Sequence, residues 1–150
     1  YDLISEMLHM AQVKKGDVVY DLGCGDGRML VLAAQKYGTR GVGFEIDPDM
    51  VRAARYNAAK NKVENLVKIV QADIYTVDIR EASVIPVYLL PEMNLKLLPQ
   101  FETLRKGSRL VFHHYDLQGY IPDQVKEVIS NEDNAKHTLY LYTTPLKRAQ

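Results

Sequence analysis

Apolar and polar positions follow two periods along the 150-residue chain. Three segments place apolar side chains three and four positions apart, which predicts amphipathic helices over residues 3–11, 28–37 and 48–59. Short apolar runs separate these segments and are typical of buried strands. The five runs cover residues 18–22, 41–46, 67–70, 84–90 and 109–112. A further helix is expected over residues 95–104, with a kink at Pro99 because proline has no N–H to donate.

The order of these elements predicts an α/β fold. Strands that alternate with helices indicate βαβ units and a doubly wound, mostly parallel sheet with helices on both faces. The last two apolar segments, 125–129 and 138–143, have no helix between them, so we expect an antiparallel C-terminal hairpin and seven strands. No linker, repeat or low-complexity stretch divides the chain, and residues 1–150 are expected to form a single domain. Such sheets bind ligands at the carboxyl ends of their strands.

Charge and composition exclude several classes of function. The 19 Lys and Arg residues balance 19 Asp and Glu residues, which disfavours duplex nucleic acid as the main ligand. No apolar run approaches the ~18 residues of a membrane span. The single cysteine, Cys24, excludes an internal disulfide and favours a cytoplasmic location. Because the chain starts at Tyr1 and not at methionine, we expect an N-terminal segment to be missing.

A glycine-rich loop follows the first predicted strand. It reads DLGCGDG over residues 21–27 and lies where a strand passes into a helix. Glu45 lies 22 positions beyond Gly23 at the end of the second strand, and Asp73 follows the third. An acid about 20 residues after such a loop holds ribose hydroxyls in nucleotide-binding sheets. The sequence therefore predicts a nucleoside site, in preference to a glycine turn that only packs a strand against a helix.

The charges around the loop indicate which nucleoside it binds. Its G-x-G-x-G spacing differs from the G-x-G-x-x-G of dinucleotide sites, and no P-loop motif is present. Residues 17–49 hold six acids and three bases, a net of −3. The carboxylates of Asp21 and Asp26 would repel a pyrophosphate, whereas they would attract an ammonium or a sulfonium. S-adenosyl-L-methionine carries both of these cations.

Two motifs resemble those of a known enzyme class. Residues 19–28 (VYDLGCGDGR) and 41–47 (GVGFEID) are similar to the first two motifs of the class I S-adenosylmethionine-dependent methyltransferases. Three later segments resemble a smaller group, the broad-specificity archaeal-type protein-lysine methyltransferases and their mitochondrial relatives. These segments are 88–94 (YLLPEMN), 107–111 (GSRLV) and 137–142 (HTLYLY). The resemblance implies a Rossmann-like fold, S-adenosyl-L-methionine as cofactor, and N-methylation of lysine side chains in a protein substrate.

The same resemblance implies a set of cofactor-binding residues. They are Asp21, Gly23, Cys24, Gly25, Glu45, Ile46, Asp73 and Ile74. The first four come from the glycine loop and surround the methionine part of the cofactor. By the same resemblance, Glu45 binds the ribose hydroxyls and Ile46 lies against one face of the adenine. Asp73 accepts a hydrogen bond from the adenine amino group, and Ile74 lies beside it. Cys24 is interpreted as a small packing residue of this loop and not as a nucleophile.

Candidate catalytic residues follow the fourth and fifth strands. Methyl transfer is an in-line displacement, so the protein mainly has to align a neutral nucleophile and exclude water. Tyr88 either lines the methyl channel or is an ordinary tyrosine at the sheet rim, and Asn94 either orients the acceptor or caps a helix. His113 is the third candidate. Neighbouring residues of a strand point to opposite faces, so His113 and His114 are not expected to share a metal ion, and no metal is predicted.

Other functions are kept as alternatives. Relatives usually read Ser-His-acid-aromatic where this chain has Phe112-His113-His114-Tyr115, which weakens the transfer of substrate identity. A small-molecule or RNA methyltransferase on the same scaffold is the first alternative, although residues 90–93 (LPEM) lack the Asn/Asp-Pro-Pro-aromatic motif of N-methylating nucleic-acid enzymes. A cofactor-binding module without catalysis is the second.

Overall fold

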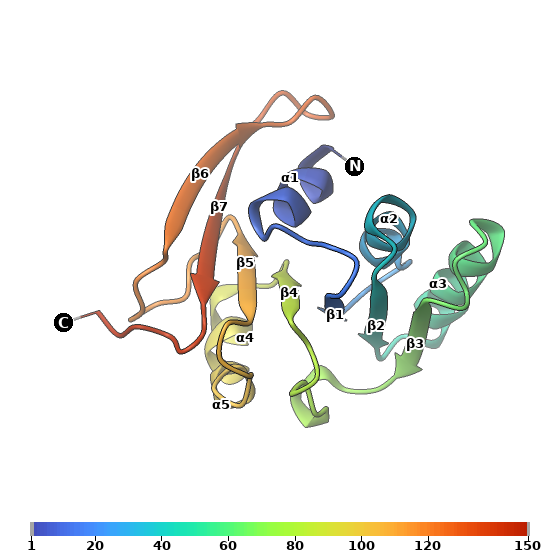
Figure 1. Cartoon of the computed structure of the whole chain (residues 1–150), viewed down its shortest axis with the longest axis horizontal. Helices are drawn as coiled ribbons and strands as arrows, with labels where there is room; N and C mark the ends of the chain where they lie inside the picture. The colour runs from blue at the N-terminus through green and yellow to red at the C-terminus, as the bar shows by residue number, and fades with distance from the viewer. Residues whose placement is uncertain (1, 150) are drawn as a thin grey trace.

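Seven strands form one mixed sheet in the order β3-β2-β1-β4-β5-β7-β6 in the computed structural model, which describes residues 2–149 (Figure 1). The prediction of a missing N-terminal segment was based on Tyr1, and this residue lies outside the described residues. The strands are β1 (Val18–Leu22), β2 (Arg40–Glu45), β3 (Val67–Gln71), β4 (Val84–Val87), β5 (Arg109–His113), β6 (Gln124–Ile129) and β7 (Lys136–Thr143). The helices are α1 (Asp2–Met10), α2 (Arg28–Tyr37), α3 (Pro48–Lys60), η1 (Ile74–Thr76), α4 (Pro91–Lys96) and α5 (Leu98–Phe101).

The pairing of the strands confirms the predicted topology. Strands β1 to β5 run parallel, and β7 pairs antiparallel with both β5 and β6. The chain moves outward from β1 to β3 and then returns to place β4 on the other side of β1. This reversal of strand order creates a crevice at the carboxyl ends of β1 and β4, which is where doubly wound sheets bind ligands.

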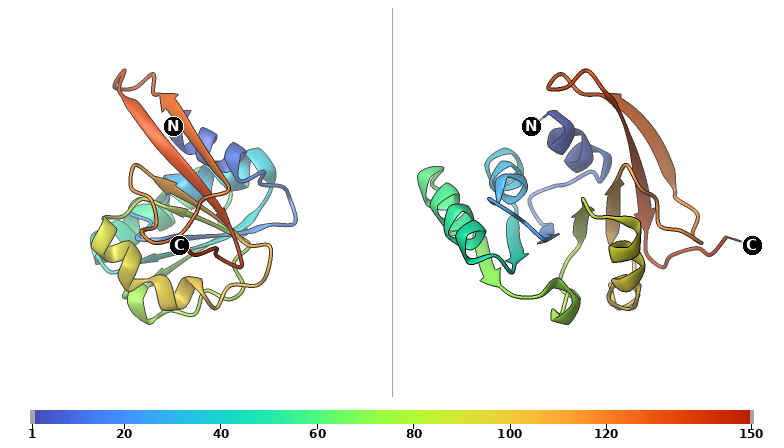
Figure 2. Two further views of the ribbon diagram at one scale, coloured as in Figure 1. Left: turned by 90° about the vertical axis from the view of Figure 1, so that its left-hand side faces the viewer. Right: turned by 180° about the vertical axis from the view of Figure 1, so that it is seen from behind.

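The two faces of the sheet bury separate apolar clusters. Residues of α1, α2 and α3 cover one face, and residues of η1, α4 and α5 cover the other, as the views of Figures 1 and 2 show. Strand β1 supplies both clusters, because side chains alternate along a strand. Val19 joins the first cluster, whereas Tyr20 and Leu22 join the second. No helix within residues 2–149 combines the length and the apolar character that crossing a membrane requires.

The C-terminal hairpin projects past the rest of the sheet, beside α1 (Figure 2). Polar contacts join these two elements. The Asp2 carboxylate accepts hydrogen bonds from the Asn131 backbone N–H (2.7 Å) and the Ser130 hydroxyl (3.0 Å). The Lys126 ammonium lies 2.8 Å from the Glu6 carboxylate. The hairpin and α1 therefore form one wall above the crevice.

The segment after β4 corrects two predictions. The strand expected over residues 84–90 ends at Val87, and the helix expected over 95–104 is instead two short helices that begin at Pro91. Pro91 occupies the first turn of α4 and Pro99 the first turn of α5, where a missing N–H is tolerated. Each proline therefore starts a helix here, and Pro99 does not kink a longer one. As a result, Tyr88 lies in a loop at the sheet edge.

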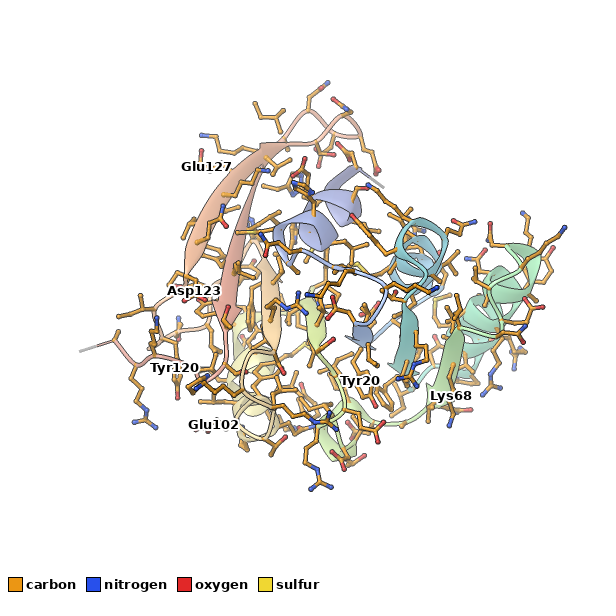
Figure 3. All side chains as sticks on the ribbon, in the orientation of Figure 1. Tyr20, Lys68, Glu102, Tyr120, Asp123 and Glu127 are labelled. Carbon is orange, nitrogen blue, oxygen red and sulfur yellow. The ribbon has the colours of Figure 1, made fainter. Side chains whose placement is uncertain are left out.

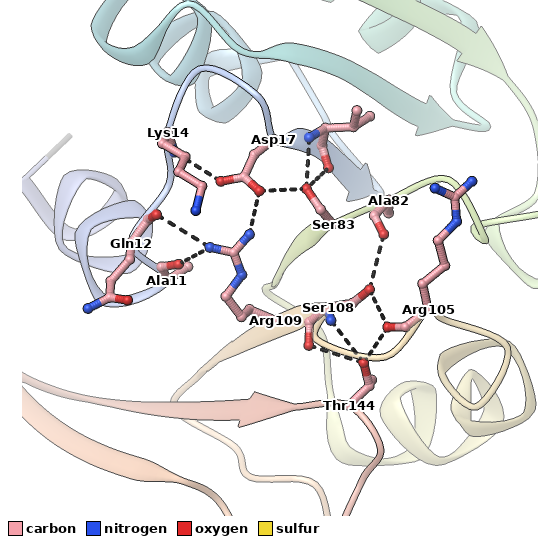
Figure 4. A network of polar contacts seen from close by, with 11 residues as sticks. Ala11, Gln12, Lys14, Asp17, Ala82, Ser83, Arg105, Ser108, Arg109 and Thr144 are labelled. Atoms are coloured by element: carbon pink, nitrogen blue, oxygen red, sulfur yellow. Dashed lines mark hydrogen bonds and ion pairs between the residues drawn. The ribbon is translucent and has the colours of Figure 1, made fainter.

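A polar network fastens the amino ends of the strands (Figure 4). Asp17 is 5% exposed and accepts hydrogen bonds from the Lys14 backbone N–H (2.9 Å), the Ser83 hydroxyl (2.8 Å) and the Arg109 guanidinium. Arg109 also donates to the Ala11 carbonyl (2.7 Å). Burial alone would raise the pKa of Asp17, but these hydrogen bonds outweigh it and hold that pKa below its usual value. The network joins the α1–β1 segment to the starts of β4 and β5.

Candidate functional site

The glycine loop connects β1 to α2 at the carboxyl edge of the sheet. Gly27 precedes α2 with φ of 80°, and a Cβ at this position would lie 3.1 Å from the Ala54 Cβ in α3. Only glycine meets both conditions without strain. Gly43 in β2 lies under the same loop, since a Cβ there would come within 2.7 Å of the Cys24 Sγ. The loop is therefore packed closely against β2 and α3.

Cys24 fills space within this loop. Its side chain is buried and lies against Gly43. Burial raises the pKa of the Cys24 thiol to about 12, and the carboxylates of Asp21 and Glu45 contribute to this rise. The thiol is therefore neutral near pH 7, which makes it a poor nucleophile.

A cavity of about 710 Å³ opens beside the glycine loop. It extends from the loop to α1, Tyr88 and the turn between β6 and β7. Residues from five parts of the chain line it, including Leu3, Asp21, Gly23, Met50, Tyr88 and His137. The predicted loop residues Cys24 and Gly25 also line the cavity. Its volume suits a small-molecule ligand.

Asp21 is the charged group buried in this cavity wall. The residue is 8% exposed, and no hydrogen bond from residues 2–149 acts on its carboxylate. Burial raises the pKa of Asp21 to about 7, and repulsion from Glu45 and Asp26 contributes to this rise. The neighbouring Asp26 instead pairs with Arg28 at 2.8 Å. A cation that enters the cavity would therefore find the carboxylate of Asp21 unpaired.

Glu45 ends β2 next to the loop. Its carboxylate accepts hydrogen bonds from the Gly25 backbone N–H (2.9 Å) and the Asp47 backbone N–H (3.1 Å). These contacts fix the carboxylate in place. An ionised carboxylate offers about four acceptor positions, so Glu45 retains the capacity to bind two hydroxyl groups.

Three further predicted residues follow β2 and β3 and, like Glu45, lie outside the lining of the cavity. Ile46 is 63% exposed, which is unusual for a large apolar side chain, and Ile74 is half-buried. Asp73 accepts a hydrogen bond from the Tyr75 backbone N–H (3.0 Å) and so caps η1. Glu45 pairs with Gln71 across β2 and β3, which places all these residues along one edge of the sheet.

Tyr88 separates two cavities. It lines the large one and a second cavity of about 200 Å³, whose walls include Leu90, Met93, His113 and Tyr115. The Tyr88 and His113 rings stack, with centroids 4.1 Å apart and an angle of 13° between their planes. Burial raises the pKa of Tyr88 to about 12, with smaller contributions from Asp133 and Asp2. The phenol is therefore neutral near pH 7 and serves as a wall more readily than as a base.

Asn94 lies beneath this region in α4. Its side chain is 1% exposed, and neither its amide nitrogen nor its amide oxygen has a hydrogen-bond partner in the described part of the chain. It lines neither of the two cavities. An unpaired buried amide is costly, so it calls for a functional explanation.

The two adjacent histidines correct the reasoning about opposite faces. Strand β5 ends at His113, and His114 has φ of 70°, so the two rings lie 5.9 Å apart between centroids. His113 Nε2 lies 2.8 Å from His137 Nδ1, and His137 Nε2 lies 2.9 Å from the Asp133 carboxylate. Sequence reasoning missed His137 and Asp133, because no motif or spacing connects them to His113. Residues 2–149 contain no group of three side chains arranged to hold a metal ion.

The strand order, the glycine loop after β1 and the acid after β2 together define a class I methyltransferase fold and site. Comparisons with known proteins agree. Residues 21–124 match the ANTKMT methyltransferase domain. The protein-lysine N-methyltransferase of Saccharolobus islandicus (strain REY15A) is 42% identical over 143 residues, which are 93% of this chain and 87% of that protein.

Two further relatives extend the comparison. The solved structure of an RNA methyltransferase from Salinibacter ruber, in complex with S-adenosyl-L-homocysteine, is 43% identical with a TM-score of 0.89, and the match covers 96% of this chain and 91% of that one. A Homo sapiens lysine N-methyltransferase, named for a subunit of ATP synthase, is 30% identical over 123 residues. That match covers 81% of this chain but only 52% of the human protein, so this chain spans about half of its length.

The chain belongs to the ANTKMT methyltransferase domain family. This membership confirms the predicted class and its kinship with archaeal protein-lysine methyltransferases.

Proposed function

We propose that this protein binds S-adenosyl-L-methionine, with the methionine part in the large cavity and the nucleoside along the adjoining edge of the sheet, and transfers its methyl group to lysine side chains of a protein. The observation that carries this proposal is the buried, unpaired carboxylate of Asp21 in the cavity wall. A buried carboxylate to which the protein supplies no cation is suited to a ligand that brings its own ammonium. Two relatives whose names specify lysine N-methylation support the acceptor.

The cofactor-binding residues follow the predicted set. Asp21 would hold the ammonium of the methionine part, with Gly23, Cys24 and Gly25 around it. Glu45 has acceptor positions left for the ribose hydroxyls. Its two present hydrogen bonds already orient the carboxylate, so binding requires little rearrangement of that side chain.

The remaining three residues would surround the adenine. The exposed side chain of Ile46 offers an apolar surface for one face of the base, and covering it would remove apolar area from water. Asp73 has carboxylate lone pairs beyond the one that caps η1, and these can accept from the adenine amino group. Ile74 follows Asp73 and is half-buried beside it.

The smaller cavity suits the acceptor. Apolar and aromatic side chains line most of it, which matches the four-carbon stem of a lysine. Tyr88 lies between this cavity and the larger one, so it would align the acceptor nitrogen with the reacting methyl group. Asn94 lines neither cavity. We propose it as a positioning residue whose buried amide gains a partner when the segment after β4 adjusts around the bound ligands, because the described part of the chain supplies none.

Methylation of RNA is the second candidate function. The Salinibacter ruber relative, described as an RNA methyltransferase, favours it. The charge of this chain favours protein instead, since 19 basic residues are matched by 19 acidic ones. Figure 3 shows Glu102 beside α5, and it shows Asp123 and Glu127 on the side that carries β6 and β7. Lys147 and Lys136 pair with the last two, so the surface has mixed charge.

Two further expectations concern the domain organisation and the location of the protein. Residues 1–150 would act as one domain, because both apolar clusters pack against the same sheet. A cytoplasmic location is consistent with the single buried cysteine, which requires no oxidising compartment.

Isotope transfer tests this function directly. The protein would be incubated with methyl-labelled S-adenosyl-L-methionine and a cell extract, and the label would be followed through protease and RNase treatment. We expect label that is sensitive to protease, resistant to RNase and located on lysine by mass spectrometry. Label removed by RNase would favour the RNA candidate. Binding of S-adenosyl-L-homocysteine without any label would indicate a module without catalysis, and Asp21→Asn serves as the low-affinity control.

A further inference from the structure

We propose that His113, His137 and Asp133 form a proton relay that removes the proton from the acceptor ammonium before methyl transfer. The inference rests on the proposed lysine acceptor. It assigns a task to two residues, His137 and Asp133, that the glycine-loop motifs do not include.

The three side chains come from three places in the fold. His113 ends β5, His137 lies in β7 and Asp133 lies in the turn between β6 and β7. The His113 Nε2 and His137 Nδ1 atoms are 2.8 Å apart. The His137 Nε2 atom is 2.9 Å and 3.2 Å from the two oxygens of Asp133. The stacked ring of Tyr88 covers His113, and this contact fixes the plane of the imidazole.

When both imidazoles are neutral, which is the state that the relay requires, the contacts fix where the protons lie. A carboxylate only accepts, so His137 carries its proton on Nε2 and donates it to Asp133. The Nδ1 of a neutral His137 is then an acceptor, and His113 must donate its Nε2 proton to it. The Nδ1 of His113 is left with a free lone pair, and no residue within 2–149 donates to it.

The relay crosses the wall between the two cavities. His113 lines the smaller cavity, where the acceptor is proposed to bind, together with Tyr88. His137 and Asp133 line the larger cavity. Asp133 is exposed, with 51% of its side-chain surface accessible, so the far end of the relay reaches solvent. A proton taken up at His113 can therefore leave at the other end.

Lysine methylation needs such a path. A free lysine side chain has a pKa of about 10.4, so only about one in 2,500 is neutral at pH 7. Burial lowers the pKa of His113 to about 4, with His137 and His114 contributing, which keeps its lone pair available. A base this weak would not by itself take a proton from an ammonium whose pKa is about 10.4, so uptake at Nδ1 has to be coupled to release of the Nε2 proton to His137.

The step balances in atoms and charge. The ε-ammonium gives a proton to His113 Nδ1, and His113 passes its Nε2 proton to His137 Nδ1. His137 then becomes an imidazolium beside the Asp133 carboxylate and releases its Nε2 proton to water. The neutral amine uses its lone pair to form the new N–C bond while the S–C bond of the sulfonium breaks. The carboxylate of Asp133 stabilises the imidazolium and does not itself need to be protonated.

Several other titratable groups face the relay. His114 follows His113 at the end of β5, and Tyr88 stacks on the His113 ring. Asp2 in α1 acts on Tyr88 through space and bonds to the turn that carries Asp133. His114 and Tyr88 make ring contacts with His113, whereas His137 is hydrogen-bonded to it and Asp133 extends the chain from His137.

Single-turnover methylation of a lysine peptide tests the relay across pH 6 to 10. We expect Asp133→Asn and His137→Gln to lower the rate at pH 7 by about 10²-fold, the lower end for acid–base groups. The loss should shrink towards pH 10, where the amine is already neutral. The rates are measured at saturating S-adenosyl-L-methionine, because His137 and Asp133 line the cavity proposed for the cofactor. Asp123→Asn is the matched control and should behave as the wild type, since Asp123 pairs with Lys147 away from both cavities.

The outcomes separate the relay from the function. A wild-type enzyme that methylates lysine, with variants of unchanged rate at pH 7, would overturn the relay and leave the proposed function standing. A wild-type protein that binds S-adenosyl-L-homocysteine but labels no lysine would overturn both. Nitrogen NMR of ¹⁵N-histidine-labelled protein adds a readout that is independent of activity and of variant folding. Both His113 and His137 should carry their proton on Nε2, and an Nδ1-protonated His113 would contradict the relay.

Discussion

Two buried aspartates at the ends of one strand have opposite environments. Asp17 precedes β1 at the amino edge of the sheet, where three donors surround it, one of them a guanidinium, and its pKa is lowered. Asp21 lies in β1 at the carboxyl edge, where no donor within residues 2–149 reaches it and its pKa is raised to about 7. Both residues are nearly inaccessible to water, and burial raises the pKa of each carboxyl. At Asp17 hydrogen bonds outweigh this effect, whereas at Asp21 no hydrogen bond opposes it.

The contrast extends to the two edges of the sheet. At the amino edge, the network around Asp17 and Arg109 satisfies the buried charges within the protein itself (Figure 4). At the carboxyl edge, Asp21 and the amide of Asn94 have no hydrogen-bond partner among the described residues. Unpaired buried polar groups reduce stability unless a ligand completes them. We infer that the amino edge stabilises the fold and that the carboxyl edge keeps its polar groups for ligands.

Replacing Asp17 should produce the largest loss of stability. Asp17→Ala leaves the guanidinium of Arg109 without its carboxylate, and breaking a buried pair costs about 3–5 kcal/mol. Because the pKa of Asp17 is lowered by folding, its contribution is present above the unfolded pKa and is lost as the pH falls through the folded value. Urea unfolding at pH 7 and at pH 3 measures both effects. Equal stability of variant and wild type at pH 7 would contradict the role of the network.

Replacing Glu45 should weaken the binding of the ligand and change the stability of the fold only slightly. Hydrogen bonds to a charged acceptor contribute about 1.5–3 kcal/mol. Glu45→Ala should therefore lower the affinity for S-adenosyl-L-homocysteine by about one to two decades. Calorimetry measures the affinity. Glu64→Ala, at an exposed glutamate in the loop before β3, is the control and should bind as the wild type. If Glu45→Ala binds S-adenosyl-L-homocysteine as tightly as the wild type, the assignment of Glu45 to the ribose hydroxyls is wrong.

Asp21→Asn should separate stability from binding. The folded pKa of Asp21 is raised, so the stability that its protonated form provides is lost as the pH rises through about 7. Asparagine cannot ionise, and the variant should therefore be more stable than the wild type at pH 8, by about 1–3 kcal/mol. Its affinity for S-adenosyl-L-homocysteine should fall by about one to two decades. A variant that is less stable at pH 8 would show that Asp21 has a partner after all.

The smallest effect is expected at Asn94. Asn94→Leu replaces an unpaired buried amide with an apolar group, which should stabilise the free protein by about 1 kcal/mol. The same change should lower kcat if the amide meets a ligand. Thermal unfolding measures the change in stability, and methylation kinetics measure the change in kcat. A more stable variant with unchanged kcat would assign Asn94 no part in the reaction.

The sequence indicated the residues proposed for the cofactor more completely than those proposed for the acceptor. The glycine loop is contiguous, and its distance to Glu45 follows from the length of one βα unit, so a local motif was sufficient. His113 and His137 meet only because β7 runs antiparallel beside β5, a register that no short motif contains. The helix after β4 was misplaced for a similar reason. Pro91 and Pro99 start helices because of their position in the turns, which periodicity alone does not show.

The release of protons on ligand binding tests the central contrast most directly. S-adenosyl-L-homocysteine would be titrated by calorimetry at pH 7 in two buffers with different ionisation enthalpies. With a pKa of about 7, Asp21 is about half protonated in the free protein, and an incoming ammonium should displace about half a proton. Asp21→Asn should release none through this group. Equal proton release by the two proteins would contradict the assignment of Asp21 as the carboxylate that receives the cofactor.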